Sequence, residues 1–227
     1  YRIEVDANGE RSFQYWREQS AARYLLTGDA YDKELASLAD IDYLYLSGIS
    51  LAILPRHDRQ KLIDGLVRAK ERGSKIWFDS NYRDKLWASA DEAQQWYRKI
   101  LQITDIAFLT FDDECQLWGD SSPEDVFARC RFYGIPEVVL KRGEESCLIE
   151  TNDKKYAVKA ISIPSEKVID TTAAGDSFNA GYLASRLQGE LLPAECAAMG
   201  HCLSSKVIQY HGAIIPRKLV YEMTESG

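Results

Sequence analysis

The segment DTTAAGDSFNAGYLASRL, residues 170–187, places small residues and one acid at the start of an apolar helix. Apolar residues recur at helical spacing from Ala180 to Leu187, which predicts a helix that begins near Ala173. The first amides of a helix have no internal partner, and the helix dipole adds positive charge there. Small side chains at 173–175 would therefore let a phosphate or a developing anion approach these amides.

Asp176 falls in the first turn of this helix, where the dipole favours negative charge. An ionised carboxylate beside an anion-binding helix end can accept the proton of a hydroxyl that attacks a γ-phosphoryl group. A structural interpretation fits the same residues, because Ala-Ala-Gly also permits close packing and an acid favours a helix start by itself. The short A-A-G-D pattern leaves both interpretations open.

The composition excludes several classes of protein. The 227 residues are enough for one α/β domain or two small ones, and 45% of them are hydrophobic. The net charge of -7, without a long Lys/Arg cluster, gives no sign of a nucleic-acid partner. The five cysteines contain no C-x-x-C and the three histidines lack metal-ligand spacing, which favours a reducing cytosol and no structural zinc. The longest apolar run is too short for a membrane span.

The arrangement of expected elements predicts the fold. The first segment alternates around Asn8-Gly9 and predicts a β-hairpin, and one or two helices are expected across 18–40. Strands then alternate with amphipathic helices, which predicts a mostly parallel, doubly wound sheet flanked by helices. The expected strands cover 41–48, 75–81, 105–110, 137–143, 146–150 and 155–161, and the expected helices cover 55–72, 89–101, 122–134, 174–187, 193–208 and 216–224, with a short helix ending at Gly119.

The full string DTTAAGDSFNAGYLA resembles the D-T-x-A-A-G-D motif near the C-terminus of the ribokinase-like (PfkB) carbohydrate kinases. The segments DYLYLSGISLAIL, FDSNYRDKLWAS, TDIAFLTFDDE, VVLKRGEESCL and VIQYHGAIIPR are similar to the branch of that family that acts on 2-keto-3-deoxygluconate. This resemblance runs from the hairpin to Pro216. It implies a ribokinase-like fold and transfer of the ATP γ-phosphate to the 6-hydroxyl of the sugar acid 2-dehydro-3-deoxy-D-gluconate.

The resemblance also assigns roles at the helix start. Asp176 would be the catalytic base, in contact with substrate, and Ala173, Ala174 and Gly175 would form the anion hole for the ATP phosphates. The sequence has no G-x-x-x-x-G-K-[ST], so the amides of 173–176 would take the place of a P-loop. Mg²⁺ is expected with ATP, and dependence on a monovalent cation stays open.

A sugar acid requires a cation for its carboxylate, and two arginines are candidates. Arg83 follows the expected strand KIWFD at a ligand-facing strand end, and Arg17 closes QYWR. The planar guanidinium can donate two parallel hydrogen bonds to a carboxylate. The resemblance implies substrate contacts for both arginines and for three further residues: Tyr1, Tyr15 and Asn81. The competing interpretations are solvated surface arginines and a hairpin packing role for Tyr1.

The segment LKRGEES is the expected nucleotide loop, because the resemblance places ATP contacts at Lys141, Gly143 and Ser146. An ordinary hairpin turn is the competing interpretation, since a glycine there serves either purpose. The helix AECAAMGHC, residues 194–202, is rich in small residues. We expect it mainly to pack closely against its neighbours, with an adenine-lining role as the alternative.

Two features depart from the family pattern. Many members carry N-x-x-E near magnesium and phosphate, whereas this chain has Thr110 at the Asn position and Asp113 or Glu114 as the acid. Helix capping would account for these acids equally well. The first strand of the family and its Gly-Gly and Asn substrate motif are not found before the hairpin, so we expect the N-terminal part of the fold to be absent and the activity of this chain alone to be doubtful.

Residues 1–17 are therefore interpreted as a β-hairpin lid and residues 18–227 as the kinase domain. The hairpin could also contact a second copy, giving a homo-oligomer. The expected partners are a small sugar acid and ATP, with no nucleic acid and no membrane, in the cytoplasm. A kinase of a neutral sugar, fructose or ribose, and a non-catalytic ligand-binding relative remain as alternatives.

Overall fold

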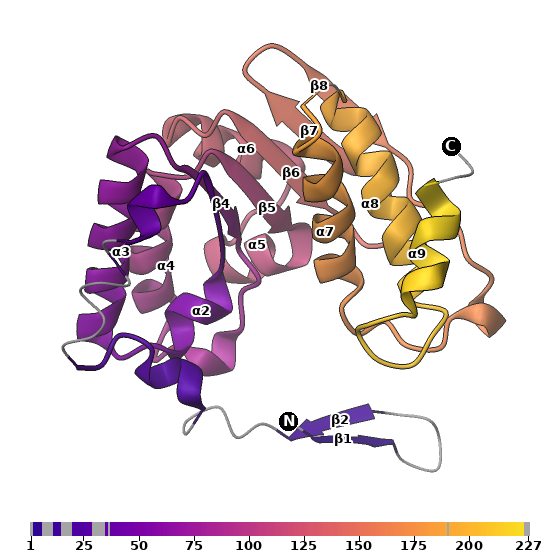
Figure 1. The fold of residues 1–227 in the computed structure, drawn as a ribbon, viewed down its shortest axis with the longest axis horizontal. Coiled ribbons are helices and arrows are strands. Elements are labelled where there is room, and N and C mark those ends of the chain that lie inside the picture. Colours follow the sequence, from indigo (N-terminus) through magenta and orange to yellow (C-terminus); the bar gives the residue numbers. More distant parts are fainter. Residues whose placement is uncertain are drawn as a thin grey trace. The chain divides into compact units, whose positions relative to one another are not determined.

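The computed structural model describes residues 2–5, 11–14, 20–28, 35, 37–189 and 191–224 (Figure 1). Strands β1 (Arg2–Val5) and β2 (Arg11–Gln14) pair antiparallel, with Arg2 opposite Gln14. Both strands of the predicted hairpin are thus confirmed, while the Asn8-Gly9 turn lies outside the described residues.

Six strands form the main sheet, in the order β3-β4-β5-β6-β7-β8. β3 and β4 are parallel, whereas β6, β7 and β8 are antiparallel neighbours. The mostly parallel sheet flanked by helices confirms the predicted fold class. The strand bounds are β3 (Tyr43–Ser47), β4 (Lys75–Asp79), β5 (Ile106–Thr110), β6 (Glu137–Lys141), β7 (Cys147–Thr151) and β8 (Lys155–Val158).

The chain divides into two compact units. The first comprises 1–107, 113–120 and 129–135, and the second comprises 108–112, 121–128 and 136–227. Three elements contribute residues to both units: β5, the helix at 111–118 and α6 (Pro123–Phe132).

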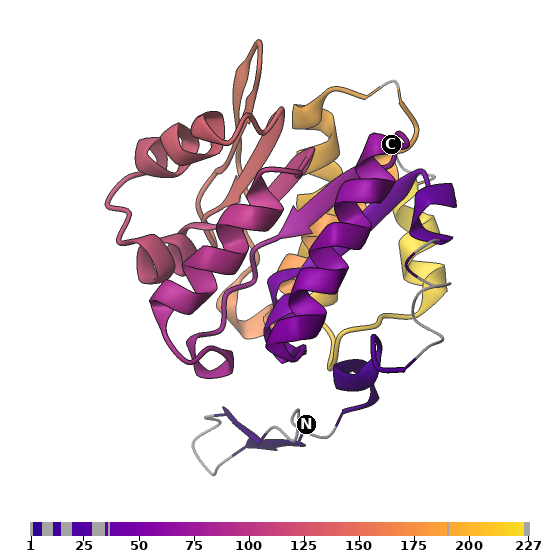
Figure 2. The ribbon, with the colours of Figure 1, turned by 90° about the vertical axis from the view of Figure 1, so that its left-hand side faces the viewer.

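The first unit contains β3, β4, the helices α2 (Gly48–Ile53), α3 (Arg56–Glu71) and α4 (Ala90–Leu101), and most of α5 (Phe111–Trp118). Figure 2 shows α3 and α4 side by side over the strands. Their buried faces include Leu66 and Ile100, which are 3% and 0% exposed. These helices confirm the predicted strand–helix alternation, and their apolar faces cover the core of the unit.

Two local features of the first unit add to the expectations from the sequence. In the described part of 18–40, 3₁₀ helices cover Ala21–Tyr24 and Leu38–Asp40, and Leu35 and Ser37 are helical. Residues 29–34 and 36 lie outside the described ranges, so the one or two helices expected across 18–40 stay a prediction. α2 was not predicted. It begins directly after β3, where Ser47 Oγ accepts a hydrogen bond from the Ile49 amide at 3.3 Å and so caps the helix.

The start of α4 carries a capping pair, as the three-residue spacing of Ser89 and Glu92 in the sequence predicts. Ser89 Oγ accepts a hydrogen bond from the Glu92 amide at 3.1 Å. The Glu92 carboxylate accepts one from the Ala88 amide at 3.2 Å, one residue earlier than in a standard capping box. Its other oxygen pairs with Arg59 Nη1 at 2.9 Å, which links the start of α4 to α3.

The second unit contains β6 to β8 and the helices α7 (Ala174–Arg186), α8 (Pro193–Val207) and α9 (Arg217–Thr224). α7 and α8 lie side by side (Figure 1). Glycines allow this contact: a Cβ at Gly181 would lie 2.8 Å from the Met199 carbonyl, and one at Gly200 would lie 2.8 Å from the Phe178 carbonyl. The expectation of close packing by the small residues of α8 is confirmed.

No helix in the described ranges has both the length and the apolar character to cross a membrane.

A buried polar cluster fixes α7 to the sheet. The Tyr182 hydroxyl donates to Glu137 Oε1 at 2.6 Å, and Arg186 Nη2 donates to Glu137 Oε2 at 3.0 Å. Burial, and then the Glu137 charge, raises the pKa of Tyr182, so its hydroxyl remains a donor. The cluster holds the body of α7 against β6 and thereby helps to place its N-terminus.

We expect Gly200→Ala to destabilise the protein although alanine is the better helix former. The added Cβ would lie 2.8 Å from a backbone carbonyl, so α7 and α8 must separate, at a cost of roughly 1–3 kcal/mol. Urea unfolding of this variant beside Ala198→Ser, at an exposed position of the same helix, measures the cost. A Gly200→Ala protein as stable as the parent would show that the helices do not pack this closely.

Candidate active site

The second unit carries the predicted anion hole at the N-terminus of α7. Ala173 is the N-cap residue and has a left-handed backbone, with φ 60° and ψ 18°. The Ala174 amide donates to the Thr171 carbonyl at 3.2 Å. The amides of Gly175 and Asp176 have no acceptor among the described residues. Both residues are exposed, so these two amides and the Asp176 carboxylate are accessible to a ligand.

Asp170 anchors the loop that leads into α7. It is 7% exposed, and its two carboxylate oxygens accept hydrogen bonds from the amides of Thr172 at 2.9 Å and Gly212 at 3.0 Å. The amides of Ile169 and Asp170 donate to the Ile208 carbonyl at the end of α8. The first acid of the D-T-T-A-A-G-D motif therefore holds the loop in place, a role that the sequence did not reveal.

Lys141, at the end of β6, lies beside the predicted anion hole. Its Nζ donates to Asn179 Oδ1 at 3.1 Å, and Asn179 is 1% exposed. A Cβ placed on Gly175 would lie 3.6 Å from the same Nζ. The ammonium group is thus held one turn along α7 from the free amides, where its charge can act on a bound phosphate. The contact of Asn179 with Lys141 was not predicted.

The predicted nucleotide loop is a tight turn between β6 and β7. Gly143 has a φ of 59°, and the Glu145 amide donates to the Arg142 carbonyl at 3.0 Å. Arg142 Nε donates to the Ser146 carbonyl at 3.0 Å. The hairpin interpretation of this segment therefore describes its backbone correctly, and the positive φ explains the glycine.

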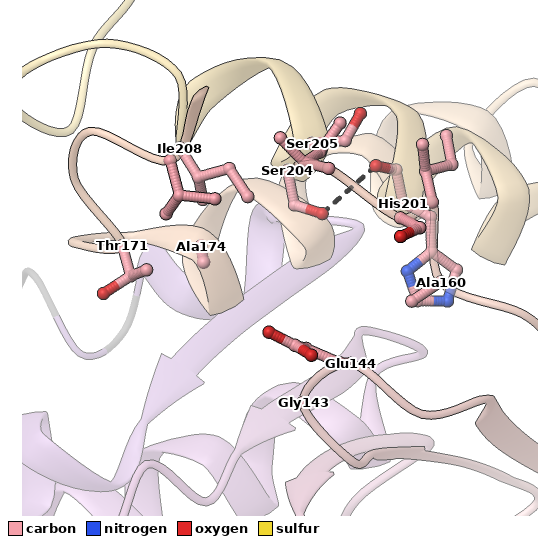
Figure 3. A pocket seen from close by; sticks show the side chains of 13 residues that line it. Gly143, Glu144, Ala160, Thr171, Ala174, His201, Ser204, Ser205 and Ile208 are labelled. Carbon is pink, nitrogen blue, oxygen red and sulfur yellow. Dashed lines mark hydrogen bonds between the residues drawn. The ribbon is translucent and has the colours of Figure 1, made fainter. Parts of the chain in front are cut away.

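This turn also borders a pocket of about 380 Å³ in the second unit (Figure 3). His201, Ser204 and Ser205 line it from α8, and Glu144 extends toward it from the turn. Its complete lining is Gly143, Glu144, Ala160, Ile161, Ser162, Ile163, Val168, Thr171, Ala174, His201, Ser204, Ser205 and Ile208. Ala174 joins the pocket to the anion hole, so one ligand could occupy both. Lys141 and Ser146 are not part of the lining.

His201 was not singled out by the sequence. It is 7% exposed, and its Nε2 has no hydrogen-bond partner in the part of the chain that the structure describes. Burial lowers the pKa of its ring, which a hydrogen bond with the Val158 backbone opposes. A neutral imidazole with a free nitrogen at a pocket wall can bond to a ligand. A lone histidine on an Ala/Cys-rich helix carries no pattern that would predict this.

The first unit carries Asn81 and Arg83 directly after β4. Asn81 has a left-handed φ of 35°, and its Nδ2 donates to Ser47 Oγ at 3.4 Å. The Arg83 side chain is 48% exposed, its Nη1 lies 3.5 Å from Asp113 Oδ2, and it donates to the Tyr82 carbonyl at 2.6 Å. A half-exposed guanidinium with one long ion pair can bind an incoming carboxylate. Tyr1, Tyr15 and Arg17 lie outside the described residues.

The two acids proposed for the magnesium region differ in environment. Glu114 is 2% exposed and pairs with Arg129 Nη2 at 2.8 Å, and Arg129 also pairs with Asp120. Asp113 is partly exposed beside Arg83. Within the described ranges, no three His, Cys, Asp or Glu side chains gather into a metal site. A magnesium ion that arrives on ATP phosphates needs no such protein cage. The partly exposed Asp113 fits such an ion, whereas Glu114 is buried and held by Arg129.

The free energy of unfolding should depend on pH through Glu114. Burial raises the pKa of Glu114 from 4.5 to about 7, although the Arg129 charge opposes the shift. Between these values the folded chain keeps a proton that the unfolded chain releases, so stability falls as pH rises, by up to about 3 kcal/mol. Urea titrations from pH 4.5 to 7.5 should show this slope for the parent protein and a weaker slope for Glu114→Gln. Equal slopes would contradict this account of the carboxyl group.

The family assignment follows from comparison with known proteins. The model of the pfkB family carbohydrate kinases matches residues 1–219, and the chain belongs to this family. It is 52% identical over 219 residues to 2-dehydro-3-deoxygluconokinase of Escherichia coli K12, covering 96% of this chain and 71% of the relative. For the protein of that name from Dickeya dadantii, identity is 50% over 217 residues, covering 95% and 70%.

A solved structure shows the same fold. A putative ribokinase II from E. coli, in complex with ATP and Mg²⁺, superposes with a TM-score of 0.76 at 22% identity and covers 90% of this chain and 63% of that one. The chain spans about 70% of the length of the two curated relatives.

Proposed function

We propose that this chain transfers the γ-phosphate of ATP to the 6-hydroxyl of 2-dehydro-3-deoxy-D-gluconate. The observation that carries the proposal is its likeness to two proteins named 2-dehydro-3-deoxygluconokinase, at 52% and 50% identity across 96% and 95% of the chain. The site agrees with this, because a half-exposed Arg83 suits a sugar acid better than a neutral sugar.

Asp176 is the catalytic base in this proposal. Its carboxylate accepts the proton of the 6-hydroxyl while the hydroxyl oxygen attacks the γ-phosphorus and the bond to the ADP oxygen breaks. The amides of Gly175 and Asp176 stabilise the negative charge of the transferring group, and the ammonium of Lys141 adds a positive charge beside them. Bound Mg²⁺ supplies further charge neutralisation at the ATP phosphates.

The pocket beside Ala174 takes the nucleoside of ATP. Its volume of about 380 Å³ lies within the usual range for ligand sites, and its walls combine apolar residues with His201, Ser204 and Ser205. Gly143 borders this pocket directly. Lys141 lies at the phosphates, and Ser146 supports the turn through its carbonyl bond to Arg142.

Arg83 binds the carboxylate of the sugar acid, with Arg17, Tyr1, Tyr15 and Asn81 as further substrate contacts. For Asn81, the bond to Ser47 and its position two residues before Arg83 support the assignment. The protein works in the cytosol, where ATP is present, and none of its five cysteines forms a disulfide, which agrees with that compartment.

Residues 1–17 form a lid element and residues 18–227 the kinase domain. A two-stranded ribbon is marginally stable alone, so contact with a second copy would stabilise the hairpin. Sedimentation velocity of the protein with and without residues 1–17 tests the oligomer. Loss of a dimer on deletion supports a hairpin contact, and an unchanged species excludes it.

Release of ADP from Mg-ATP, measured with 2-dehydro-3-deoxygluconate, fructose and ribose, tests the substrate assignment. We expect turnover confined to the keto acid. Faster turnover of a neutral sugar would replace this proposal with the neutral-sugar kinase alternative.

A further inference from the structure

The connection between β4 and Arg83 adopts a constrained backbone. Asn81 has φ 35°, in the left-handed region that most side chains avoid. Ser80, directly before it, is 0% exposed. A residue pair held in this way does not adjust freely. The groups that contact Ser80 therefore determine the position of the backbone at Arg83.

Tyr97 and Gly48 enclose the Ser80 carbonyl. The Tyr97 hydroxyl, on α4, donates to that carbonyl in a short hydrogen bond. A Cβ on Gly48 would lie 2.0 Å from the same carbonyl oxygen and 2.1 Å from the Tyr97 hydroxyl. The space therefore admits the hydroxyl only because residue 48 has no side chain, and the carbonyl is fixed from both sides.

Glu114 lies close to the side-chain hydroxyl of Ser80. The Ser80 hydroxyl is among the groups that lower the pKa of Glu114, so the two lie close together. Both the Ser80 Oγ and Glu114 Oε1 are buried, and neither has a hydrogen-bond partner in the described part of the chain. The second oxygen of Glu114 is held by Arg129 at 2.8 Å. Glu114 is thus a buried carboxyl group that Arg129 holds in place near Ser80.

Two adjacent residues of α5 therefore lie against residues 80–83. Glu114 lies near Ser80, and Asp113 pairs with the Arg83 guanidinium. We propose that Tyr97 and Glu114 are positioning residues that fix the Ser80–Asn81 turn and so present Arg83 to the substrate carboxylate. The inference rests on the proposed function, because it assigns Arg83 to a sugar acid. Neither residue touches substrate in this account.

Tyr97→Phe and Glu114→Ala test the proposal through substrate affinity. Each should raise the KM for 2-dehydro-3-deoxygluconate at least about fivefold and leave the KM for ATP within about twofold, a split that general loss of stability does not produce. Glu114→Gln keeps a polar group opposite Ser80 and should retain a KM close to that of the parent. Thr104→Val is the matched control, since it removes another buried hydroxyl that donates to a carbonyl at the end of α4, at 2.8 Å.

Amide hydrogen exchange at residues 81–83, in the same samples without substrate, gives a readout independent of activity. Exchange should accelerate at least about tenfold in Tyr97→Phe and not in Thr104→Val. Unchanged exchange together with an unchanged keto-acid KM in the active variants overturns the positioning role alone. A parent protein that fails to phosphorylate the keto acid overturns the proposed function, and the exchange result still decides whether the turn depends on Tyr97.

Discussion

Replacing Asp176 with asparagine is expected to lower kcat for phosphoryl transfer by about 10³-fold. The amide cannot accept the proton of the attacking hydroxyl, and general-base catalysis is commonly worth 10²–10⁴-fold. The anion hole consists of backbone amides that the substitution leaves in place, so the KM for ATP should change by less than about threefold. A coupled assay of ADP release with saturating keto acid gives both constants.

Asp91→Asn is the matched control for Asp176→Asn. Asp91 is also an exposed acid in the first turn of a helix, α4, but it lies in the first unit and has no proposed role in the reaction. It should retain full activity. If Asp176→Asn kept more than about a tenth of the parental kcat, Asp176 would be a helix-start residue, as the structural interpretation of the sequence holds.

Arg83→Ala is the second substitution with a large expected effect. Hydrogen bonds to a charged group contribute about 1.5–3 kcal/mol, so the KM for the keto acid should rise roughly 10- to 100-fold. The ordered contacts of Arg83 with Asp113 and the Tyr82 carbonyl are few, so the folded structure should tolerate the change. Initial rates measured at varied keto acid and at varied ATP give the KM for each substrate separately.

Arg83→Lys distinguishes charge from geometry. Lysine keeps the positive charge but lacks the planar fork, so its KM should fall between those of the parent and Arg83→Ala. Equal KM values for the keto acid in all three proteins would remove Arg83 from the substrate site and leave Arg17 as the carboxylate-binding candidate.

The sequence predicted the elements whose determinants are local. The start of α7, the capping pair at Ser89 and the strand–helix alternation each depend on residues a few positions apart. The sequence could propose Ala173, Ala174 and Gly175 for an anion hole because their motif is contiguous. The structure adds that Ala173 adopts a left-handed backbone, which an alanine in a sequence does not predict.

The contacts that the sequence did not predict join residues far apart in the chain. Asp170 bonds to Gly212 across 42 positions, Lys141 to Asn179 across 38 and Tyr182 to Glu137 across 45. The hydropathy pattern of each segment predicts its helix or strand but does not indicate which distant residue will be its polar partner. For the same reason, Glu114 could be recognised as a buried, Arg-paired carboxylate only from its three-dimensional surroundings.

Identification of the product tests the central claim most directly. The protein would be incubated with Mg-ATP and 2-dehydro-3-deoxygluconate, beside Asp176→Asn, and the product examined by mass spectrometry and phosphorus–proton correlation NMR. The account predicts a single monophosphate, esterified at the 6-hydroxyl, formed by the parent and almost absent with Asp176→Asn. A phosphate at another hydroxyl, or equal yield from the variant, would contradict it.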